Sequence, residues 1–227
     1  MSYRIVTPIL NEEKYIRKFL ESFPEKHLPH LILVDDGSHD KTAEIIKADY
    51  PNITCLKHKI NLGKGKSLET GALKAIHDKA DIIVFMDGDM QHNPEDISRF
   101  LEVFQKHPEV DIVFGARKIG KSMPLIAFLG NKILTISINL LFRYLLNDTQ
   151  CGFRAFRSKV FNKIRWESHG YSIETEMIIN AAKHLLNYKE ITIDTIYLEG
   201  YKGTNIFDGI VILLKILGWR ILKFFKS

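Results

Sequence analysis

The sequence has 227 residues, of which 45% are hydrophobic, and its formal net charge is +5. That length suits one large α/β domain or a fused pair of lobes, and the apolar content supports a hydrophobic core. The two cysteines, Cys55 and Cys151, have no paired spacing, which argues against a disulfide scaffold or a zinc site and favours a reducing compartment. The first ten residues already have a strand-like pattern, so we expect no signal peptide.

The charge is divided unevenly along the chain. Residues 1–117 contain 16 basic and 19 acidic side chains, a net charge of −3, whereas residues 118–227 contain 16 and 8, a net charge of +8. A basic second half favours an anionic partner, such as a phosphate group, a nucleic acid or a membrane surface.

Short apolar runs that alternate with helical patterns predict a mostly parallel α/β sheet, wound on both sides, over roughly the first 117 residues. Asn11 is expected to cap a first helix that buries Ile16, Phe19 and Leu20. The predicted strands are Arg4–Thr7, His30–Val34, Ile53–Leu56, Ile82–Phe85 and Val110–Gly115.

Two long apolar patterns distinguish the second half of the chain. Pro124–Leu146 predicts a helix with one polar stripe, and Ile206–Phe225 predicts a basic amphipathic helix with Trp219 on its apolar side. Their charge-free apolar runs of about ten residues are shorter than the ~18–20 residues that a membrane span needs. The last helix is therefore expected in a membrane interface, on the sheet or in a dimer. Between them, the patterns predict a loop and short strand at Thr149–Phe156, a helix at Ile173–Leu186 and a strand at Ile191–Tyr197.

Acidic residues follow the predicted strand Ile82–Phe85. Asp87 and Asp89, one residue apart and followed by Gln91, offer hard oxygen ligands for Mg²⁺ or Mn²⁺ at the carboxyl edge of the sheet. Asn93-Pro94-Glu95 then predicts the start of a helix. A solvated acidic turn is the alternative. A phosphatase-type Asp-x-Asp pair would be expected on the first strand, with Thr or Val where this chain has Gln91.

Two further loops allow more than one interpretation. Asn61–Ser67 ends like a phosphate-binding P-loop before a helix over residues 68–79, but Ile60 stands where that motif needs glycine. Asp35-Asp36-Gly37-Ser38 suits either the binding of a base or ribose or an ordinary turn.

Taken together, the motifs resemble those of the family 2 glycosyltransferases of the GT-A fold, in the same order and spacing: VTPILNEEKYI, LVDDGSHDKT, NLGKGKS, MDGDMQHNPED and FGARK. The fourth is similar to the metal-site signature of dolichyl-phosphate mannose synthases, whereas DTQCGFRAF at 148–156 is nearer to dolichyl-phosphate glucosyltransferases, and GYSIETEM at 170–177 suits either. The resemblance covers about residues 3–205. The chain departs from it at Leu10, where Tyr is frequent, at Gly88, where mannose synthases usually have Ala, and at Gln150-Cys151, which replaces Thr-Ser.

This resemblance implies a set of site residues. Asp87, Asp89 and Gln91 would bind Mg²⁺ or Mn²⁺ on the donor diphosphate. The catalytic residues would be Asp89, Arg117, Arg154 and Lys202, with Arg117 and Lys202 beside phosphates and Arg154 on the acceptor phosphate. The nucleotide-sugar would be held by residues of several loops: Pro8, Leu10, Glu12, Val34, Asp36, Lys64, Asp87, Gly88, Asp89, Gln91 and Arg117.

The implied reaction is a metal-dependent, inverting transfer of mannose or glucose from GDP-mannose or UDP-glucose to a polyprenyl (dolichyl) phosphate. A lipid phosphate is nucleophilic at neutral pH, so the site needs no strong general base. The resemblance implies peripheral contact with the cytoplasmic face of a membrane, or a membrane-protein partner, and no nucleic acid. The alternatives are a glycan or another lipid as acceptor, or a nucleotide-sugar-binding subunit that needs a membrane-anchored partner.

The same resemblance predicts one GT-A-like domain over residues 1–227. Residues 1–117 would bind the nucleotide-sugar, residues 118–205 the acceptor, and residues 206–227 would form the amphipathic helix. Glu174 and Glu176 are two positions apart on a helix, so at most one points into the site, and Glu176 fits the family better. Helix N-terminal charge is the alternative for both. His92 is expected to be a solvated loop residue.

Overall fold

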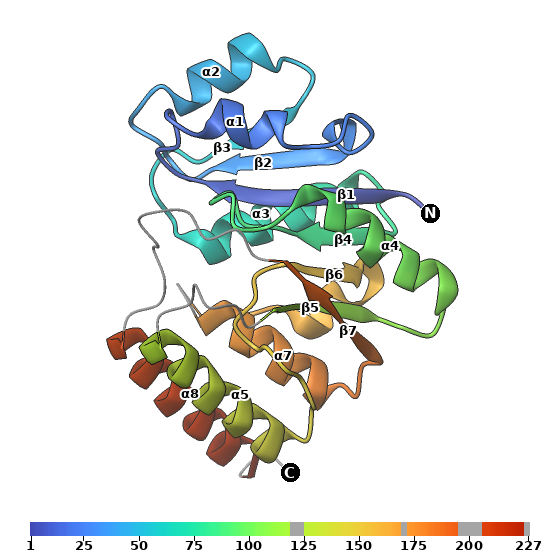
Figure 1. The fold of residues 1–227 in the computed structure, drawn as a ribbon, viewed down its shortest axis with the longest axis vertical. Helices are drawn as coiled ribbons and strands as arrows, with labels where there is room; N and C mark the ends of the chain where they lie inside the picture. The colour runs from blue at the N-terminus through green and yellow to red at the C-terminus, as the bar shows by residue number, and fades with distance from the viewer. Residues whose placement is uncertain (119–124, 169–171, 195–205, 225–227) are drawn as a thin grey trace.

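The computed structural model describes residues 1–118, 125–168, 172–194 and 206–224. These residues form one seven-stranded sheet in the order β3-β2-β1-β4-β6-β5-β7 (Figure 1). The strands are β1 Tyr3–Ile9, β2 Leu31–Asp35, β3 Thr54–Lys57, β4 Ile82–Phe85, β5 Ile112–Arg117, β6 Arg154–Arg157 and β7 Tyr188–Ile193.

One strand runs against the others. β6 is antiparallel to both of its neighbours, β4 and β5, whereas the pairs β1–β2, β1–β4, β2–β3 and β5–β7 are parallel. A parallel strand presents its carboxyl end to the ligand edge, but an antiparallel strand presents its amino end there. The loop that precedes β6 therefore lies at the same edge as the loops that follow β1, β2, β4 and β5.

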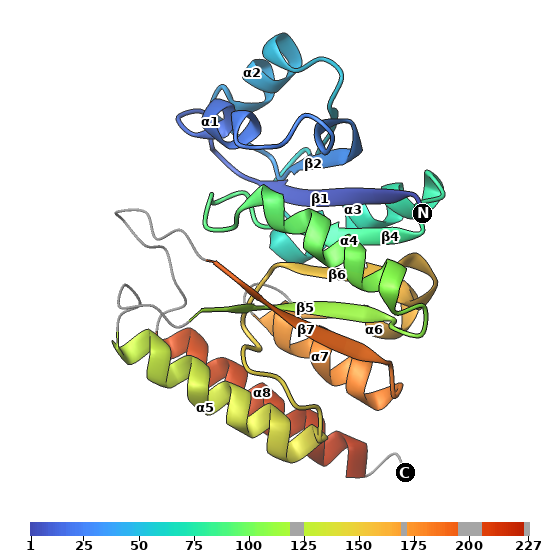
Figure 2. The same cartoon turned by 45° about the vertical axis from the view of Figure 1, so that its right-hand side comes forward.

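Helices cover both faces of the sheet. The α-helices are α1 Ile16–Glu21, α2 Thr42–Asp49, α3 Lys64–His77, α4 Ile97–Lys106, α5 Leu125–Phe142, α6 Phe161–Ile164, α7 Ile173–Lys183 and α8 Ile206–Phe224. Short 3₁₀ helices precede β2, α4 and α6: η1 Leu28–His30, η2 Pro94–Asp96 and η3 Ser158–Val160. α5 and α8 lie side by side at the end of the molecule opposite α1 and α2 (Figures 1 and 2).

Alternation along the strands divides the apolar side chains into two cores. Val6, Val34 and Phe85 face the core beneath α3, α6 and α7, to which Leu134 of α5 and Ile216 of α8 also contribute. The other core lies beneath α1, α2 and α4, with the opposite strand positions: Ile5, Ile9, Leu31, Leu33, Ile82, Val84, Val113 and Ala155. Because both faces are covered, the strands are apolar at consecutive positions.

The structure confirms the mostly parallel α/β fold and the strand Ile82–Phe85, and shifts several boundaries. The prediction that Asn11 caps α1 is wrong, because α1 begins at Ile16 and the Asn11 side chain accepts a hydrogen bond from His39 N at 3.0 Å. α3 begins at Lys64 rather than at residue 68, and α5 ends at Phe142 rather than at Leu146. Two short helices, α2 and α6, were not predicted, and β7 begins at Tyr188 instead of Ile191.

Asn93 behaves as predicted, since its side chain accepts a hydrogen bond from Glu95 N at 3.1 Å where η2 leads into α4. Over the described ranges, no helix combines the length and apolarity required to cross a bilayer.

Candidate active site

The polar residues of the candidate site gather at the ligand edge of the sheet. Asp87 follows β4, Lys64 is the first residue of α3, and Glu174 lies in the first turn of α7. The Lys64 Nζ atom is 2.7 Å from Asp87 Oδ1 and 2.8 Å from Glu174 Oε1. One ammonium group thus joins two carboxylates from parts of the chain that are distant in sequence.

The neighbouring charges shift the pKa values of Lys64 and Asp87. Burial alone would lower the pKa of the Lys64 ammonium, but Asp87 and Glu174 outweigh burial and raise that pKa above its ordinary value. Burial would raise the pKa of the Asp87 carboxyl, yet Lys64 and the other neighbouring cationic groups hold it below the ordinary value. The Lys64 ammonium and the Asp87 carboxylate therefore both stay charged at neutral pH.

The second carboxylate of the pair, Asp89, has a different environment. Surrounding protein atoms and then the Asp87 carboxylate raise the pKa of Asp89 to about 6, although the residue is open to solvent on one side. Asp89 Oδ1 accepts a hydrogen bond from Gln91 N at 3.0 Å. Met90 between them has a φ of 61°, in the left-handed region that methionine rarely adopts. This strained turn lies where the predicted metal ligands are.

Two glycines let the chain pass close to Asp87-Gly88-Asp89. A Cβ atom on Gly152, in the loop before β6, would lie 2.3 Å from Asp87 Oδ2. A Cβ atom on Gly88 would lie 3.1 Å from both Pro8 O and Ile9 Cγ2 of β1. The Gly152 position thus requires glycine, because any larger residue would collide with the carboxylate.

The donor set fits a divalent cation that also uses ligands from a substrate. Among the residues that the structure describes, no three His, Cys, Asp or Glu side chains are grouped closely enough to hold a metal ion by themselves. Mg²⁺ is commonly bound by one or two carboxylates together with substrate phosphates. Asp87 and Asp89 supply such a pair, and the Lys64 ammonium already shows that a cation is held against Asp87 Oδ1.

Arg117 and Asp148 form the next polar pair along the edge. Arg117 Nε donates to Asp148 Oδ2 at 2.6 Å and an Nη atom donates to Asp148 Oδ1 at 3.0 Å, in a two-pronged contact. Burial would raise the pKa of Asp148, but Arg117 outweighs burial and holds that pKa below its ordinary value. Asp148 belongs to the DTQCGFRAF segment, yet its pairing with Arg117 was not foreseen.

A family assignment follows from comparison with known proteins. The sequence profile described as "Glycosyl transferase family 2" matches residues 4–165. The chain belongs to this family. Membership of this family makes the chain a glycosyltransferase.

Relatives of this glycosyltransferase extend over nearly the whole chain. An uncharacterized protein of Methanocaldococcus jannaschii is 36% identical, covering 96% of this chain and 91% of its own. The UDP-N-acetylglucosamine–dolichyl-phosphate N-acetylglucosaminyltransferase of Methanococcus voltae is 32% identical, covering 94% of each chain. A dolichyl-phosphate beta-glucosyltransferase of Trichomonas vaginalis is 27% identical, covering 87% of this chain and 67% of its own.

A solved structure confirms the fold of the glycosyltransferase. Glucosyl-3-phosphoglycerate synthase from Mycobacterium tuberculosis, in complex with Mn²⁺, UDP and phosphoglyceric acid, superposes with a TM-score of 0.75. The match covers 96% of this chain and 78% of that one, at 18% sequence identity. At this identity the likeness establishes the shared GT-A architecture alone.

Two predicted donor residues have structural roles in the glycosyltransferase. The Asp36 carboxylate accepts hydrogen bonds from Leu62 N at 3.0 Å and Gly63 N at 2.7 Å, and His58 Nδ1 lies 2.7 Å from it. Asp36 thus holds the amino-terminal end of α3 rather than presenting a free carboxylate. The Val34 side chain is wholly buried in the core beneath α3, so only its main chain is available for any contact with a donor.

The first and second loops of the edge are joined to one another. Asn11 N donates to Ser38 Oγ at 2.9 Å, and Glu12 N donates to Thr42 Oγ1 at 2.8 Å. Pro8, half-buried at the end of β1, and Leu10, 36% exposed, border the same loop. Pro8, Leu10 and Glu12 therefore lie in loops that hydrogen bonds hold together. Their contact with a nucleotide stays a prediction.

Main-chain carbonyl groups surround the Arg154 guanidinium, and its contact with an acceptor phosphate stays a prediction. Its side chain is buried, and its guanidinium donates to the carbonyl oxygens of Cys151 at 2.8 Å, Thr149 at 3.0 Å and Glu174 at 2.5 Å. Contact with an acceptor phosphate would require this shell to open. In the described structure, Arg154 fixes the loop before β6 and ties it to the start of α7.

Glu176 and His92 lie in positions that differ from the predicted ones. Glu174, not Glu176, reaches the cluster, since Glu176 accepts hydrogen bonds from Glu167 N at 3.0 Å and Ser168 N at 2.9 Å. His92 is buried 4.0 Å from Asp87 Oδ2 rather than solvated, and burial lowers its pKa to about 4. Lys202 lies outside the described residues.

Proposed function

We propose that this glycosyltransferase transfers a sugar from a nucleotide-sugar to a polyprenyl phosphate. The observation that carries the proposal is the Asp87–Asp89 pair at the end of β4, within a chain that aligns along 94% of a dolichyl-phosphate N-acetylglucosaminyltransferase. Relatives named as dolichyl-phosphate glucosyltransferases support the same acceptor class. The name of the M. voltae relative favours a UDP-linked donor over GDP-mannose.

The residues of the edge suit a single displacement with inversion. Asp87 and Asp89 would hold a divalent cation, Mg²⁺ or Mn²⁺, which stabilises charge on the leaving nucleoside diphosphate when bound. Gly88 keeps β1 close behind this pair, and Gln91 is the proposed supporting ligand. Arg117, oriented by Asp148, would face a phosphate group of the donor or acceptor. The acceptor phosphate needs no strong base, because it is already ionised at neutral pH.

The surface formed by α5 and α8 supports a location at a membrane. α5 exposes an apolar row at the helical spacing of Leu129, Ile133, Ile136 and Leu140, with Leu140 74% exposed. α8 exposes a second row at Val211, Leu214 and Leu217, and the two helices lie side by side (Figure 2). We propose that these rows lie in the interface of a bilayer, on the cytoplasmic face, where an isoprenoid tail is available.

A donor panel tests the transfer reaction. Purified protein receives polyprenyl phosphate, Mn²⁺ and labelled UDP-N-acetylglucosamine, UDP-glucose or GDP-mannose, and the lipid is then extracted. We expect label in the lipid phase with a UDP-linked donor, and at least a hundredfold loss in Asp89→Asn. Asp49→Asn, in an exposed pair with Arg17, is the matched control.

Three outcomes separate the alternatives. Label that enters a glycan or a different lipid instead of polyprenyl phosphate would change the acceptor. Transfer that begins only after membranes with their proteins are added would support a subunit that depends on a partner. Absence of transfer with every donor and acceptor, despite nucleotide binding, would reject the enzymatic proposal for the isolated chain.

A further inference from the structure

Lys64 occupies the open oxygen of the carboxylate that the proposed metal needs. Asp87 Oδ2 is enclosed, because Gly152 lies against it and His92 Nε2 is 4.0 Å away. Asp87 Oδ1 is the other oxygen, and Lys64 Nζ lies 2.7 Å from it. A cation that binds Asp87 at Oδ1 therefore has to displace the Lys64 ammonium.

We propose that Lys64 is an exchangeable counter-ion that holds Asp87 when the donor site is empty and moves to the donor diphosphate when a divalent cation binds. This inference rests on the proposed function and adds a role for a residue that the sequence placed only in the donor site. Glu174 keeps the ammonium beside the site through its 2.8 Å contact.

Electrostatic repulsion makes simultaneous occupancy costly. The repulsion between two positive charges grows as they approach and as they leave water, so an ammonium group and a divalent cation on the same carboxylate oxygen would repel each other strongly. The three carboxylates of Asp87, Asp89 and Glu174 outnumber the two cationic side chains beside them, Lys64 and the buried Arg154. A divalent cation therefore gains from the excess of negative charge, but only if Lys64 leaves Asp87 Oδ1.

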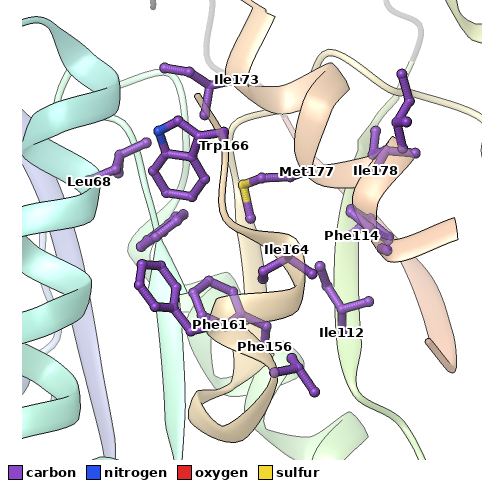
Figure 3. Close-up of a cluster of buried hydrophobic side chains, with 14 of the residues drawn as sticks. Leu68, Ile112, Phe114, Phe156, Phe161, Ile164, Trp166, Ile173, Met177 and Ile178 are labelled. Carbon is purple, nitrogen blue, oxygen red and sulfur yellow. The ribbon is translucent and has the colours of Figure 1, made fainter. Parts of the chain in front are cut away.

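The backbone around Lys64 is tightly packed, so exchange would move only the Lys64 side chain. A Cβ atom on Gly65 would lie 2.8 Å from Ile173 Cδ1 and 3.0 Å from Trp166 Nε1, so the start of α3 packs tightly against α7. In Figure 3, Trp166 lies beside Leu68 of α3 and Ile173 of α7. The Glu174 carbonyl is in turn held by Arg154. The helix ends are thus fixed, whereas the Lys64 side chain keeps 27% exposure.

A permanent ion pair between α3 and α7 is the competing interpretation, and binding measurements separate the two. Mn²⁺ binding is followed by electron paramagnetic resonance of free Mn²⁺, without nucleotide, for wild type and Lys64→Met. UDP binding in saturating Mn²⁺ is followed by calorimetry. Lys66→Met is the matched control, because Lys66 is in the same turn but pairs with Glu69, which also contacts Arg165.

Exchange predicts two effects of opposite sign in Lys64→Met. Without nucleotide, Mn²⁺ should bind about tenfold more tightly because its competitor is gone, and UDP should bind about tenfold more weakly because the diphosphate loses a cation. Lys66→Met should match wild type in both measurements. Unchanged UDP affinity in Lys64→Met would overturn exchange and leave the proposed function standing. Failure of wild type to bind Mn²⁺ even with UDP would overturn both.

Discussion

Gly152 and Asp87 approach so closely that a Cβ atom on the glycine would lie 2.3 Å from Oδ2 of the carboxylate. This contact joins the loop before β6 to the end of β4 across 65 residues of sequence. For Gly152→Ala we expect the carboxylate to rotate away from its position, since a carbon and an oxygen atom at that distance overlap. Sugar transfer and Mn²⁺ affinity should each fall by at least tenfold.

Gly130→Ala controls for the loss of a glycine as such. Apart from the neighbouring backbone of α5 itself, no described atom lies within 4 Å of its added Cβ, and alanine inside a helix is favoured by about 1 kcal/mol. Activity of Gly130→Ala should equal that of wild type. Normal transfer by Gly152→Ala, at normal Mn²⁺ affinity, would show that the contact is not needed for the site.

The positions that sequence patterns predict well are those set by local chemistry. Ile82–Phe85 has the consecutive apolar residues of a strand covered on both faces, and Asn93 caps the following turn through atoms two residues away. Both features were predicted correctly. The metal-site motif also lies at the predicted edge, because that edge follows from strand direction alone.

The features that were missed depend on partners far away in sequence. Lys64 contacts Glu174 across 110 residues, and β6 enters the sheet between β4 and β5 in the antiparallel direction. A motif specifies residue types but not which of two neighbouring carboxylates a distant lysine selects, so Glu176 was preferred. The backbone contacts of Asp36 were not foreseen for the same reason, since its partners are the main-chain N–H groups of Leu62 and Gly63.

Asp148 should be needed for both stability and activity. Asp148→Asn removes the negative charge that pairs with Arg117 through two hydrogen bonds. Breaking a buried ion pair lowers the free energy of unfolding by about 3–5 kcal/mol. We expect a loss of about 2–3 kcal/mol, because both side chains keep 11% exposure, together with a lower affinity for nucleotide. Urea unfolding and UDP calorimetry measure the two effects.

Asp194→Asn is the matched substitution for this pair. Asp194 contacts Lys118 at 2.8 Å, one residue along from Arg117, but both side chains are more than 60% exposed. Solvent and salt screen exposed ion pairs, so the unfolding free energy should barely change. Equal losses in the two variants would contradict the distinction between the pairs.

Arg154→Lys tests the structural role of that arginine. Lysine has a single ammonium group and cannot reproduce the planar fork that reaches the three carbonyls of Cys151, Thr149 and Glu174. We expect the free energy of unfolding to fall by about 2–4 kcal/mol, because buried carbonyl groups lose their donors. Arg17→Lys, in an exposed pair, should be neutral. Stability equal to wild type in Arg154→Lys, with weaker binding of acceptor, would restore the predicted contact with phosphate.

His27 should make stability depend on pH. The residue is buried, with Nδ1 2.8 Å from the Tyr3 hydroxyl and Nε2 3.1 Å from the Ser98 hydroxyl, and burial lowers its pKa to about 4. Between pH 6.5 and 4 the unfolded chain therefore binds a proton that the folded protein does not, so stability falls as the pH decreases through this range. Above pH 6.5 both states are neutral at His27, and its contribution is fully present.

His27→Gln removes this titration while keeping a side chain that can donate to one hydroxyl and accept from the other. Urea unfolding at half-unit steps from pH 7 to 4.5 should give a flatter dependence of unfolding free energy on pH than in wild type. His77→Gln, whose side chain is 84% exposed, should leave the wild-type dependence in place. A His27→Gln curve parallel to that of wild type would assign the acid sensitivity to other groups, of which buried His92, with a pKa also lowered by burial to about 4, is the first to test.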